Sequence, residues 1–344
     1  MKEALLYEQL ADDCVRCNLC SHRCDIKPGR RGICGVRQND QGVLHTLVYG
    51  RLIARHVDPI EKKPLFHLLP GSRSYSIATV GCNFRCRFCQ NADIAQMPRD
   101  FDGRVTGETA TPEAVVADAL RQRCATIAYT YTEPTIFFEM ALETARLAHD
   151  RGLRNVFVSN GYMSAEALEM IAPCLDGANV DLKAFNDEFY KRQCGARLAP
   201  VCDTLRRMKD RGILLEVTTL IIPGLNDDPE ELTRLAGFIA DDLGPETPWH
   251  ISRFHPTYLL TDRPPTPVGT LQRARDIGVQ AGLRYVYMGN VPGEAGENTL
   301  CHHCGAMLIE RLGFAVRRNN VLRDGGCPDC GTPVHGVEMA GTGA

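Results

Sequence analysis

The sequence predicts an α/β fold, a partial (β/α)6-type barrel with a cysteine-rich N-terminal module and a zinc-ribbon-like C-terminal module. Short apolar runs alternate with amphipathic segments between residues 75 and 290, as expected for parallel strands joined by helices. The chain has 344 residues and is 44% apolar, which suits one large domain with appendages. Most of its 16 cysteines fall in three clusters, two of which flank the alternating region.

The apolar runs predict seven strands, at residues 75–80, 126–130, 155–158, 178–182, 214–222, 250–254 and 284–287. The amphipathic segments predict six helices, at residues 112–123, 136–151, 165–171, 200–211, 229–243 and 270–282. Seven strands in about 215 residues suit an open or incomplete barrel better than a short doubly wound sheet.

Three regions follow from this pattern. Residues 1–74 lack a sustained period and contain turn signals, so we expect a metal-bound module and a lead-in loop. Residues 75–295 form the predicted barrel, and residues 296–344 form a compact cysteine-rich tail.

Composition and charge exclude several classes of protein. The balance of 39 basic and 42 acidic residues gives no electrostatic reason to expect a nucleic-acid partner. The sequence has no uncharged apolar run of about 18 residues, so we expect no membrane span. The first residues are too acidic for a signal peptide, which predicts a cytoplasmic protein whose cysteines are metal ligands rather than disulfides.

The central cluster consists of Cys82, Cys86 and Cys89, directly after the first predicted strand. Three thiolates suit a cubane iron–sulfur cluster, which takes one sulfur ligand per iron and would keep its fourth iron open. A structural zinc ion would require four protein ligands. A loop at the carboxyl end of a strand is also where parallel-sheet enzymes place their chemistry.

This segment, Cys82-x3-Cys86-x-Phe88-Cys89, resembles the signature of the radical S-adenosylmethionine (SAM) superfamily. In that superfamily a [4Fe–4S] cluster binds SAM through its open iron and cleaves it reductively to a 5′-deoxyadenosyl radical. The similarity covers about residues 58–290 and is nearest to the pyruvate formate-lyase activating enzymes. It implies a partial barrel of the radical SAM type, with Phe88 beside the cofactor.

The resemblance further implies SAM contacts at the carboxyl ends of successive predicted strands. Glu133 would hold the amino group, Asn160 would lie near the ribose, and Lys183 would meet the carboxylate. These residues are complementary in charge or hydrogen bonding to the groups that SAM presents. The implied contacts are Thr132, Glu133, Ser159, Asn160, Asp181, Lys183 and His255.

The C-terminal cysteines are spaced as two CxxC pairs separated by 22 residues, a pattern typical of a four-thiolate zinc ribbon. Zinc is the favoured metal, and an auxiliary iron–sulfur cluster is the alternative. The predicted ligands are Cys301, Cys304, Cys327 and Cys330.

The N-terminal cluster has five cysteines, one more than a four-thiolate site needs. Glycine and basic residues between its last two members describe a loop that a metal could order. Zinc and an auxiliary [4Fe–4S] cluster both remain open, and Cys14 is a spare thiol or an alternative ligand. The favoured ligands are Cys17, Cys20, Cys24 and Cys34.

Together, the three cysteine sets and the barrel are similar to the radical SAM enzymes of the AmmeMemoRadiSam system, which implies the other proteins of that system as partners. The leading hypothesis is a redox enzyme that abstracts a hydrogen atom from a small molecule or peptide, with flavodoxin or ferredoxin as electron donor. The first alternative is an activase of a glycyl-radical enzyme, which acts on a protein. The second is a non-catalytic, zinc-dependent scaffold.

Overall fold

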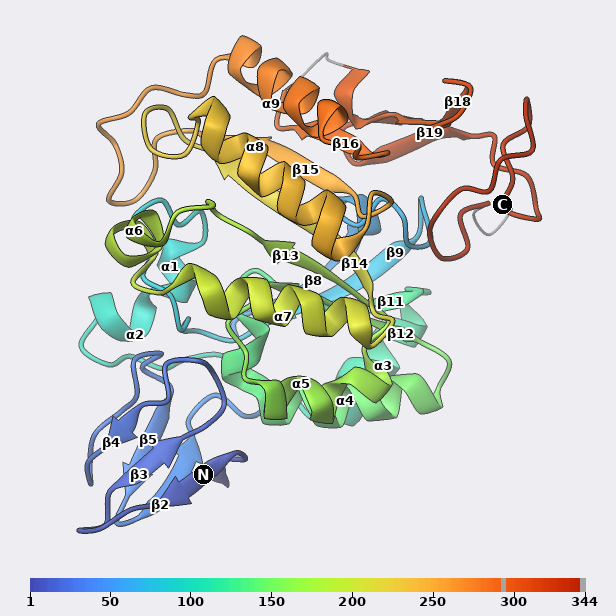
Figure 1. Cartoon of the computed structure of the whole chain (residues 1–344). Coiled ribbons are helices and arrows are strands. Elements are labelled where there is room, and N and C mark those ends of the chain that lie inside the picture. Colours follow the sequence, from blue (N-terminus) through green and yellow to red (C-terminus); the bar gives the residue numbers. More distant parts are fainter. Residues whose placement is uncertain (292–294, 341–344) are drawn as a thin grey trace.

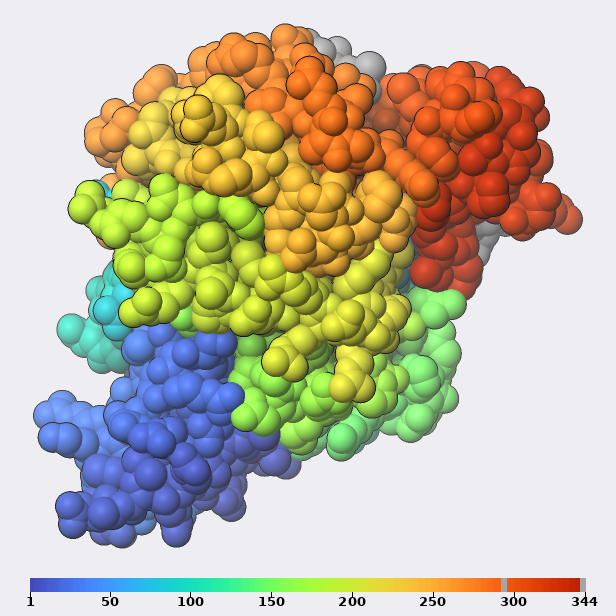
Figure 2. Space-filling model, in the orientation of Figure 1, coloured from blue at the N-terminus to red at the C-terminus, as the bar shows by residue number. Residues whose placement is uncertain are grey.

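The computed structural model describes residues 1–291 and 295–340. Residues 292–294 of the predicted barrel and 341–344 of the predicted tail therefore lie outside the described residues. In Figure 1 the N-terminal module lies at the lower left of the barrel and the C-terminal module at the upper right, so the two cysteine-rich modules contact different parts of it. Figure 2 shows both as lobes on the surface of the central domain.

One eight-stranded sheet organises the central domain, in the order β16-β15-β14-β13-β12-β11-β9-β8. The strands from β9 to β16 pair in parallel, as the apolar runs predict. Among the described strands none joins β8 to β16, so the barrel is open. The strands are β8 (Ala54–Pro59), β9 (Arg73–Ala78), β11 (Thr126–Tyr129), β12 (Arg154–Ser159), β13 (Gly177–Asp181), β14 (Leu214–Ile221), β15 (Trp249–Arg253) and β16 (Val286–Gly289).

Strand β8 is a feature that the sequence pattern did not predict. It lies inside the range 1–74 that we expected to be a module and a loop, yet it pairs antiparallel with β9 as the edge of the main sheet. Its sequence, Ala-Arg-His-Val-Asp-Pro, has no apolar run because most of its side chains are exposed or half-buried.

Helices connect the parallel strands and lie on the outer side of the sheet (Figure 1). The six predicted helices are present as α3 (Pro112–Arg121), α4 (Phe138–Asp150), α5 (Ala165–Ile171), α7 (Leu198–Asp210), α8 (Pro229–Phe238) and α9 (Val268–Gln280). Shorter helices are α1 (Ala92–Ala95), α2 (Met97–Asp100) and α6 (Asp187–Phe189). Capping explains where α3 and α8 begin, because the side chains of Thr111 and Asp228 accept a backbone hydrogen bond and a proline follows each.

The N-terminal module consists of short strands rather than an irregular loop. Two three-stranded sheets form, in the orders β1-β6-β5 and β2-β3-β4, and β7 pairs with β10. The strands are β1 (Lys2–Glu3), β2 (Tyr7–Gln9), β3 (Val15–Cys17), β4 (Asp25–Ile26), β5 (Arg37–Asp40), β6 (Val43–Thr46), β7 (Arg51–Leu52) and β10 (Glu108–Thr109). Strands this short carry little periodicity, which is why the sequence pattern predicted none of them.

The C-terminal module has its own small core and a sheet of β17 (Thr299–Leu300), β18 (Met307–Leu312) and β19 (Ala315–Asn319). It docks on the central domain through Arg311, whose side chain is fully buried. The guanidinium donates to the Phe66 carbonyl at 2.9 Å and to the Thr299 hydroxyl at 2.7 Å, and lies 3.6 Å from the Glu61 carboxylate. A buried cation thus joins the two parts of the chain.

No described helix combines the length and the apolar character that crossing a bilayer requires.

We predict that Arg311→Met lowers the free energy of unfolding by about 3 kcal/mol, because it leaves the Glu61 carboxyl buried without its cation. Urea unfolding of the full chain measures this. The control is Arg318→Met, which removes an exposed ion pair with Glu310 and should change stability by less than about 0.5 kcal/mol. Equal effects of the two substitutions would contradict the docking role of Arg311.

Candidate functional site

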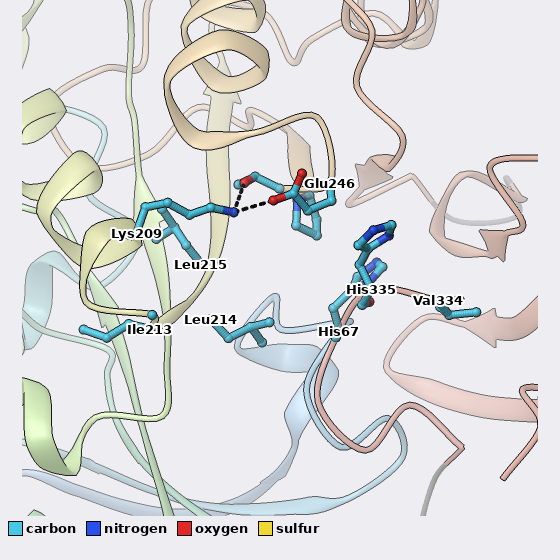
Figure 3. A pocket seen from close by; sticks show the side chains of 12 residues that line it. His67, Lys209, Ile213, Leu214, Leu215, Glu246, Val334 and His335 are labelled. Carbon is cyan, nitrogen blue, oxygen red and sulfur yellow. Dashed lines mark hydrogen bonds and ion pairs between the residues drawn. The ribbon is translucent and has the colours of Figure 1, made fainter. Parts of the chain in front are cut away.

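Two hollows in the described part of the central domain have the volume of a small-molecule site. The first, of about 440 Å³, lies at the amino ends of β14 and β15, against the C-terminal module (Figure 3). Two of its charged side chains neutralise each other, since Lys209 Nζ lies 2.7 Å from Glu246 Oε1. An ion pair at the amino ends of parallel strands is typical of a structural role rather than a catalytic one.

The second hollow, of about 410 Å³, lies at the carboxyl ends of the parallel strands. Its volume is in the range of small-molecule sites. Residues that follow β9, β11, β12 and β13 line it together, and they include all three cysteines of the central cluster. This is the candidate active site.

The cysteine loop begins where β9 ends. Backbone hydrogen bonds fix it from the opposite side, because Arg85 N donates to the Cys194 carbonyl at 2.8 Å and Arg87 N to the Gln193 carbonyl at 2.9 Å. The Phe84 backbone N–H also donates to the sulfur of Cys82 at 3.3 Å. The loop thus holds its thiols in place without regular secondary structure.

The spacing of the central thiols argues against a single metal ion. Within the described residues, only the C-terminal set brings its ligand atoms within 4.8 Å of one another. Thiolates on one zinc ion must lie about 3.8 Å apart, given a Zn–S bond of about 2.3 Å and tetrahedral geometry. Thiolates of a cubane lie farther apart because each binds a different iron. The central set, Cys82, Cys86 and Cys89, lacks the close spacing of a single-ion site.

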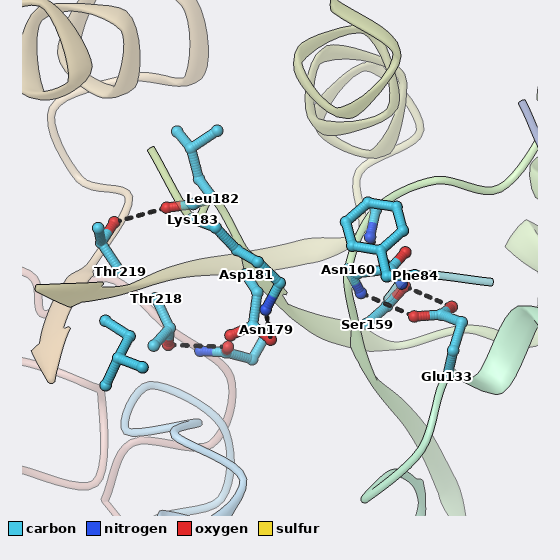
Figure 4. A network of polar contacts seen from close by, with 12 residues as sticks. Phe84, Glu133, Ser159, Asn160, Asn179, Asp181, Leu182, Lys183, Thr218 and Thr219 are labelled. Carbon is cyan, nitrogen blue, oxygen red and sulfur yellow. Dashed lines mark hydrogen bonds and ion pairs between the residues drawn. The ribbon is translucent and has the colours of Figure 1, made fainter. Parts of the chain in front are cut away.

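Glu133 is a buried carboxylate at the end of β11, held by donors from two neighbouring segments (Figure 4). Oε1 accepts from the Thr135 N–H at 3.0 Å and the Ser159 hydroxyl at 2.9 Å, and Oε2 accepts from the Asn160 N–H at 2.8 Å. Burial raises the pKa of Glu133, and these hydrogen bonds act in the opposite direction. The carboxyl group is therefore fixed in orientation beside the cysteine loop.

Lys183 supplies a positive charge on the other side of the cavity. Its Nζ lies 3.0 Å from Asp181 Oδ2 and 5.8 Å from the centre of the Phe88 ring. Burial would lower the pKa of Lys183, but Asp181 and the thiols of Cys86 and Cys194 raise it well above its ordinary value. The ammonium group is thus held charged next to the cysteines.

The residues present fit a cubane cluster with SAM. The cavity offers an anion at Glu133 and a cation at Lys183, which match the ammonium and carboxylate of SAM. Asn160, which lines the cavity, donates from Nδ2 to the Oδ1 of Asn83 at 2.8 Å. The buried Nδ2 of Asn83 has no hydrogen-bond partner among the described residues, but Asn83 is not among the residues that line the cavity.

The structure brings ten of the eleven predicted cluster and SAM residues together around this cavity, namely Cys82, Cys86, Phe88, Cys89, Thr132, Glu133, Ser159, Asn160, Asp181 and Lys183. It does not place His255 there. His255 is exposed on the loop after β15, and it is not among the residues that line the cavity.

The sequence reasoning missed several polar residues that line the cavity. Thr218 and Asn179 come from the middle of β14 and β13 and bond to each other at 2.8 Å. Alternation could have found Asn179, since it lies two residues before Asp181 and shares its face of the strand. Other lining residues that were missed are Asn91, Ser252 and Asn290.

The C-terminal cysteines form a tight site within the small core of that module. Sulfur separations are 3.6 Å for Cys301 and Cys330 and 3.7 Å for Cys304 and Cys327. Each CxxC pair forms the same turn, closed by a glycine with positive φ: Gly305 N donates to the Cys301 carbonyl, and Gly331 N to that of Cys327, both at 2.9 Å. These separations suit four thiolates on one ion.

Comparisons with known proteins agree with this geometry. Residues 76–236 match the model of the radical SAM superfamily. The chain is 46% identical to an uncharacterized protein of Methanocaldococcus jannaschii, MJ0808, over 97% of its own length and 99% of that protein. It is 24% identical to the pyruvate formate-lyase-activating enzyme of Listeria monocytogenes, over 49% of its own length and 70% of that enzyme.

Among solved structures, the chain is similar to Streptococcus suis SuiB bound to the precursor peptide SuiA, with a TM-score of 0.51 and 11% identity. The match covers 68% of this chain and 52% of SuiB. Because the sequence identity is low, the match shows similarity of fold alone. A buried carboxylate, a largely buried ammonium and three loop cysteines lie at one sheet edge. Together with the family match and the activating-enzyme relatives, they lead to one conclusion: residues 76–236 form a domain of the radical SAM superfamily, which implies a [4Fe–4S] cluster and SAM, and the chain is an enzyme.

Proposed function

We propose that Cys82, Cys86 and Cys89 hold the [4Fe–4S] cluster and that the cavity beside them binds SAM. The arrangement of Glu133 and Lys183 on either side of the cysteine loop carries this proposal, because opposite charges would fix both ends of the methionine moiety. When bound, the cluster and SAM supply a 5′-deoxyadenosyl radical by one-electron cleavage of SAM, and this radical abstracts a hydrogen atom from the substrate. Flavodoxin or ferredoxin is the proposed class of electron donor.

The protein's own residues orient the charged groups that face SAM and enclose the cavity. Thr135, Ser159 and the Asn160 backbone direct the Glu133 carboxylate into the cavity, and Asp181 positions the Lys183 ammonium. Phe88 is buried and covers the cavity beside Lys183 with an apolar ring. The apolar ring of Phe88 limits the access of water to a reactive species on that side of the cavity.

For the substrate we propose a peptide or a small molecule. The turn between β18 and β19 supports this, because Phe314 lines the cavity although it belongs to the C-terminal module. Phe314 is 48% exposed, so an apolar group at the cavity would be free to contact a substrate from outside the barrel. The similarity in fold to SuiB, whose structure contains the precursor peptide SuiA, also supports a peptide substrate.

The alternative is activation of a glycyl-radical enzyme. It is supported by the similarity to pyruvate formate-lyase-activating enzymes, which covers half of the chain. Membership of the AmmeMemoRadiSam system, with its other proteins as partners, is a further proposal that rests on the three cysteine sets. A non-catalytic scaffold is not supported, because the superfamily match and the activating-enzyme relatives indicate an enzyme.

We predict that the anaerobically reconstituted protein forms 5′-deoxyadenosine from SAM in the presence of dithionite. A variant with Cys82→Ala, Cys86→Ala and Cys89→Ala should form none, because it lacks the ligands of the cluster. Chromatography of the reaction mixtures measures the product. Equal yields from the protein and the variant would refute the proposed function.

Lys183→Ala should weaken SAM binding by roughly 10- to 100-fold, the size expected when a charged hydrogen bond is lost. The iron content should not change, because Lys183 lines the cavity and is not a ligand of the cluster. Equilibrium binding of SAM and elemental analysis measure the two effects. Lys191→Ala is the matched control, because Lys191 is half-exposed and pairs only with Asp187. Unchanged affinity in Lys183→Ala would remove the role given to this residue.

We propose zinc at the C-terminal cysteines and predict one zinc ion per chain at this site. Replacing Cys301 and Cys304 with serine should release that zinc and reduce solubility, because the small core around it loses its crosslink. Elemental analysis checks this, with Cys124→Ser, a buried thiol outside the three sets, as control. If the double replacement releases iron and sulfide instead of zinc, the site holds an auxiliary cluster.

A further inference from the structure

The N-terminal cysteines form a second buried thiol set that the proposed function does not use. Strand pairing brings two of them together, since Cys17 N donates to the Cys24 carbonyl at 2.9 Å. The sulfur of Cys24 in turn lies 3.7 Å from the position that a Cβ on Gly32 would occupy, two residues before Cys34. All four thiols of the set are buried or half-buried.

The four thiols lie close enough to interact electrostatically, since Cys17 and Cys24 both act on Cys20 and on Cys34. Within the described chain, no three of them are grouped as tightly as the C-terminal set.

A buried cation with free donors lies beside these thiols. Arg37 of β5 is 1% exposed, and its Nη2 pairs with Glu139 Oε1 at 3.0 Å. Its Nε and Nη1 have no hydrogen-bond partner among the described residues. Burial acts to lower the pKa of Arg37, and Glu139 together with the thiols of Cys17, Cys34 and Cys20 raises it. The free donors of a buried cation favour an anion nearby, and a four-thiolate metal centre would supply one.

The spread of the thiols distinguishes between the two candidate metals. The C-terminal set has the separation of about 3.8 Å that one zinc ion demands, and the N-terminal set does not. In this respect the N-terminal set resembles the central set, which is also not gathered within 4.8 Å among the described residues. A cubane, in which each thiolate binds its own iron, does not require so close a spacing.

The N-terminal set also adjoins the central cysteine loop. His22 Nε2 lies 2.8 Å from the carbonyl oxygen of Asn83, which follows Cys82. The Cys34 carbonyl would lie 3.1 Å from a Cβ on Gly81, so the two loops meet where only glycine fits. Cys34 and Cys82 line one cavity of about 220 Å³. The two cysteine sets are thus neighbours in space.

We propose that Cys17, Cys20, Cys24 and Cys34 bind a second [4Fe–4S] cluster, which passes electrons to the cluster of the active site. The binding of a second cluster is independent of the proposed function, and only the electron transfer to the active-site cluster rests on it. A reduced flavodoxin or ferredoxin gives one electron to the N-terminal cluster, which returns to its oxidised state when it reduces the central cluster by one electron. No proton or other reactant is consumed.

The first test removes the central cluster and leaves the N-terminal module intact. The full-length variant with Cys82→Ala, Cys86→Ala and Cys89→Ala, reconstituted with ferrous iron and sulfide, should retain about four iron and four sulfide per chain. After reduction it should give an electron paramagnetic resonance signal that SAM does not change. A variant with bound zinc at the N-terminal set and no iron or sulfide would overturn the proposal.

The second test uses the N-terminal ligands. Replacing Cys20 and Cys24 with serine should halve the iron, from about eight to about four atoms per chain, while Cys14→Ser should leave it unchanged. The double variant should lose reduction of its remaining cluster by reduced flavodoxin in stopped-flow measurements, yet dithionite should still reduce that cluster. Reduction by flavodoxin at the unaltered rate would overturn the electron-transfer role.

The two proposals fail in different ways. If the triple alanine variant keeps its iron but the unaltered protein forms no 5′-deoxyadenosine, the proposed function is wrong and the N-terminal cluster stands. If the unaltered protein cleaves SAM and the triple variant holds only zinc, this inference alone is wrong.

Discussion

The parallel ladder from β9 to β16 is the constraint on which the rest of the structure depends. Because these strands all run in one direction, their carboxyl ends meet at one edge, and the loops that follow them converge. Cys82, Glu133 and Lys183 are separated by long stretches of sequence, yet they line one cavity for this reason. The helices cover the outer face of the sheet, so the loops at this edge are free to carry polar side chains.

Burial then determines what the polar side chains can do. A carboxylate and an ammonium group removed from water are costly unless each is paired or hydrogen-bonded. Glu133 is hydrogen-bonded by three neighbouring residues and Lys183 is paired with Asp181, so both groups are held in fixed positions. Fixed charges of opposite sign are suited to a zwitterionic ligand.

The three cysteine sets differ in geometry although their sequence spacings look alike. The C-terminal thiols are gathered by two equivalent glycine turns into a separation that suits one ion. The central thiols lie on an irregular loop and the N-terminal thiols lie on and between short strands, with Cys17 in β3, and neither set is gathered within 4.8 Å among the described residues. Spacing along the chain left the metal of the N-terminal set open, because the distance between two sulfurs depends on how the loops fold.

Much of the architecture could be predicted because it follows from local patterns. Apolar runs and amphipathic segments placed the seven parallel strands and the six helices close to where they lie, since burial on both faces of a parallel sheet leaves a strong signal. Strand β8 and the small N-terminal sheets were missed, because exposed edge strands of a few residues leave almost no periodic signal in the sequence. Among the site residues, His255 was expected beside the cofactor and lies exposed outside the cavity.

By itself, the sequence determined the fold class, the order of strands and helices, and the identity of the cysteines and charged residues at the strand ends. Those features are encoded in short windows of the chain, where period and residue type are sufficient. The tertiary structure alone decided that the N-terminal cysteines adjoin the central loop, that Arg37 lies buried beside them, and that Phe314 reaches the cavity. Each of these depends on contacts between segments far apart in the chain, and no local pattern records which distant surfaces will pack together.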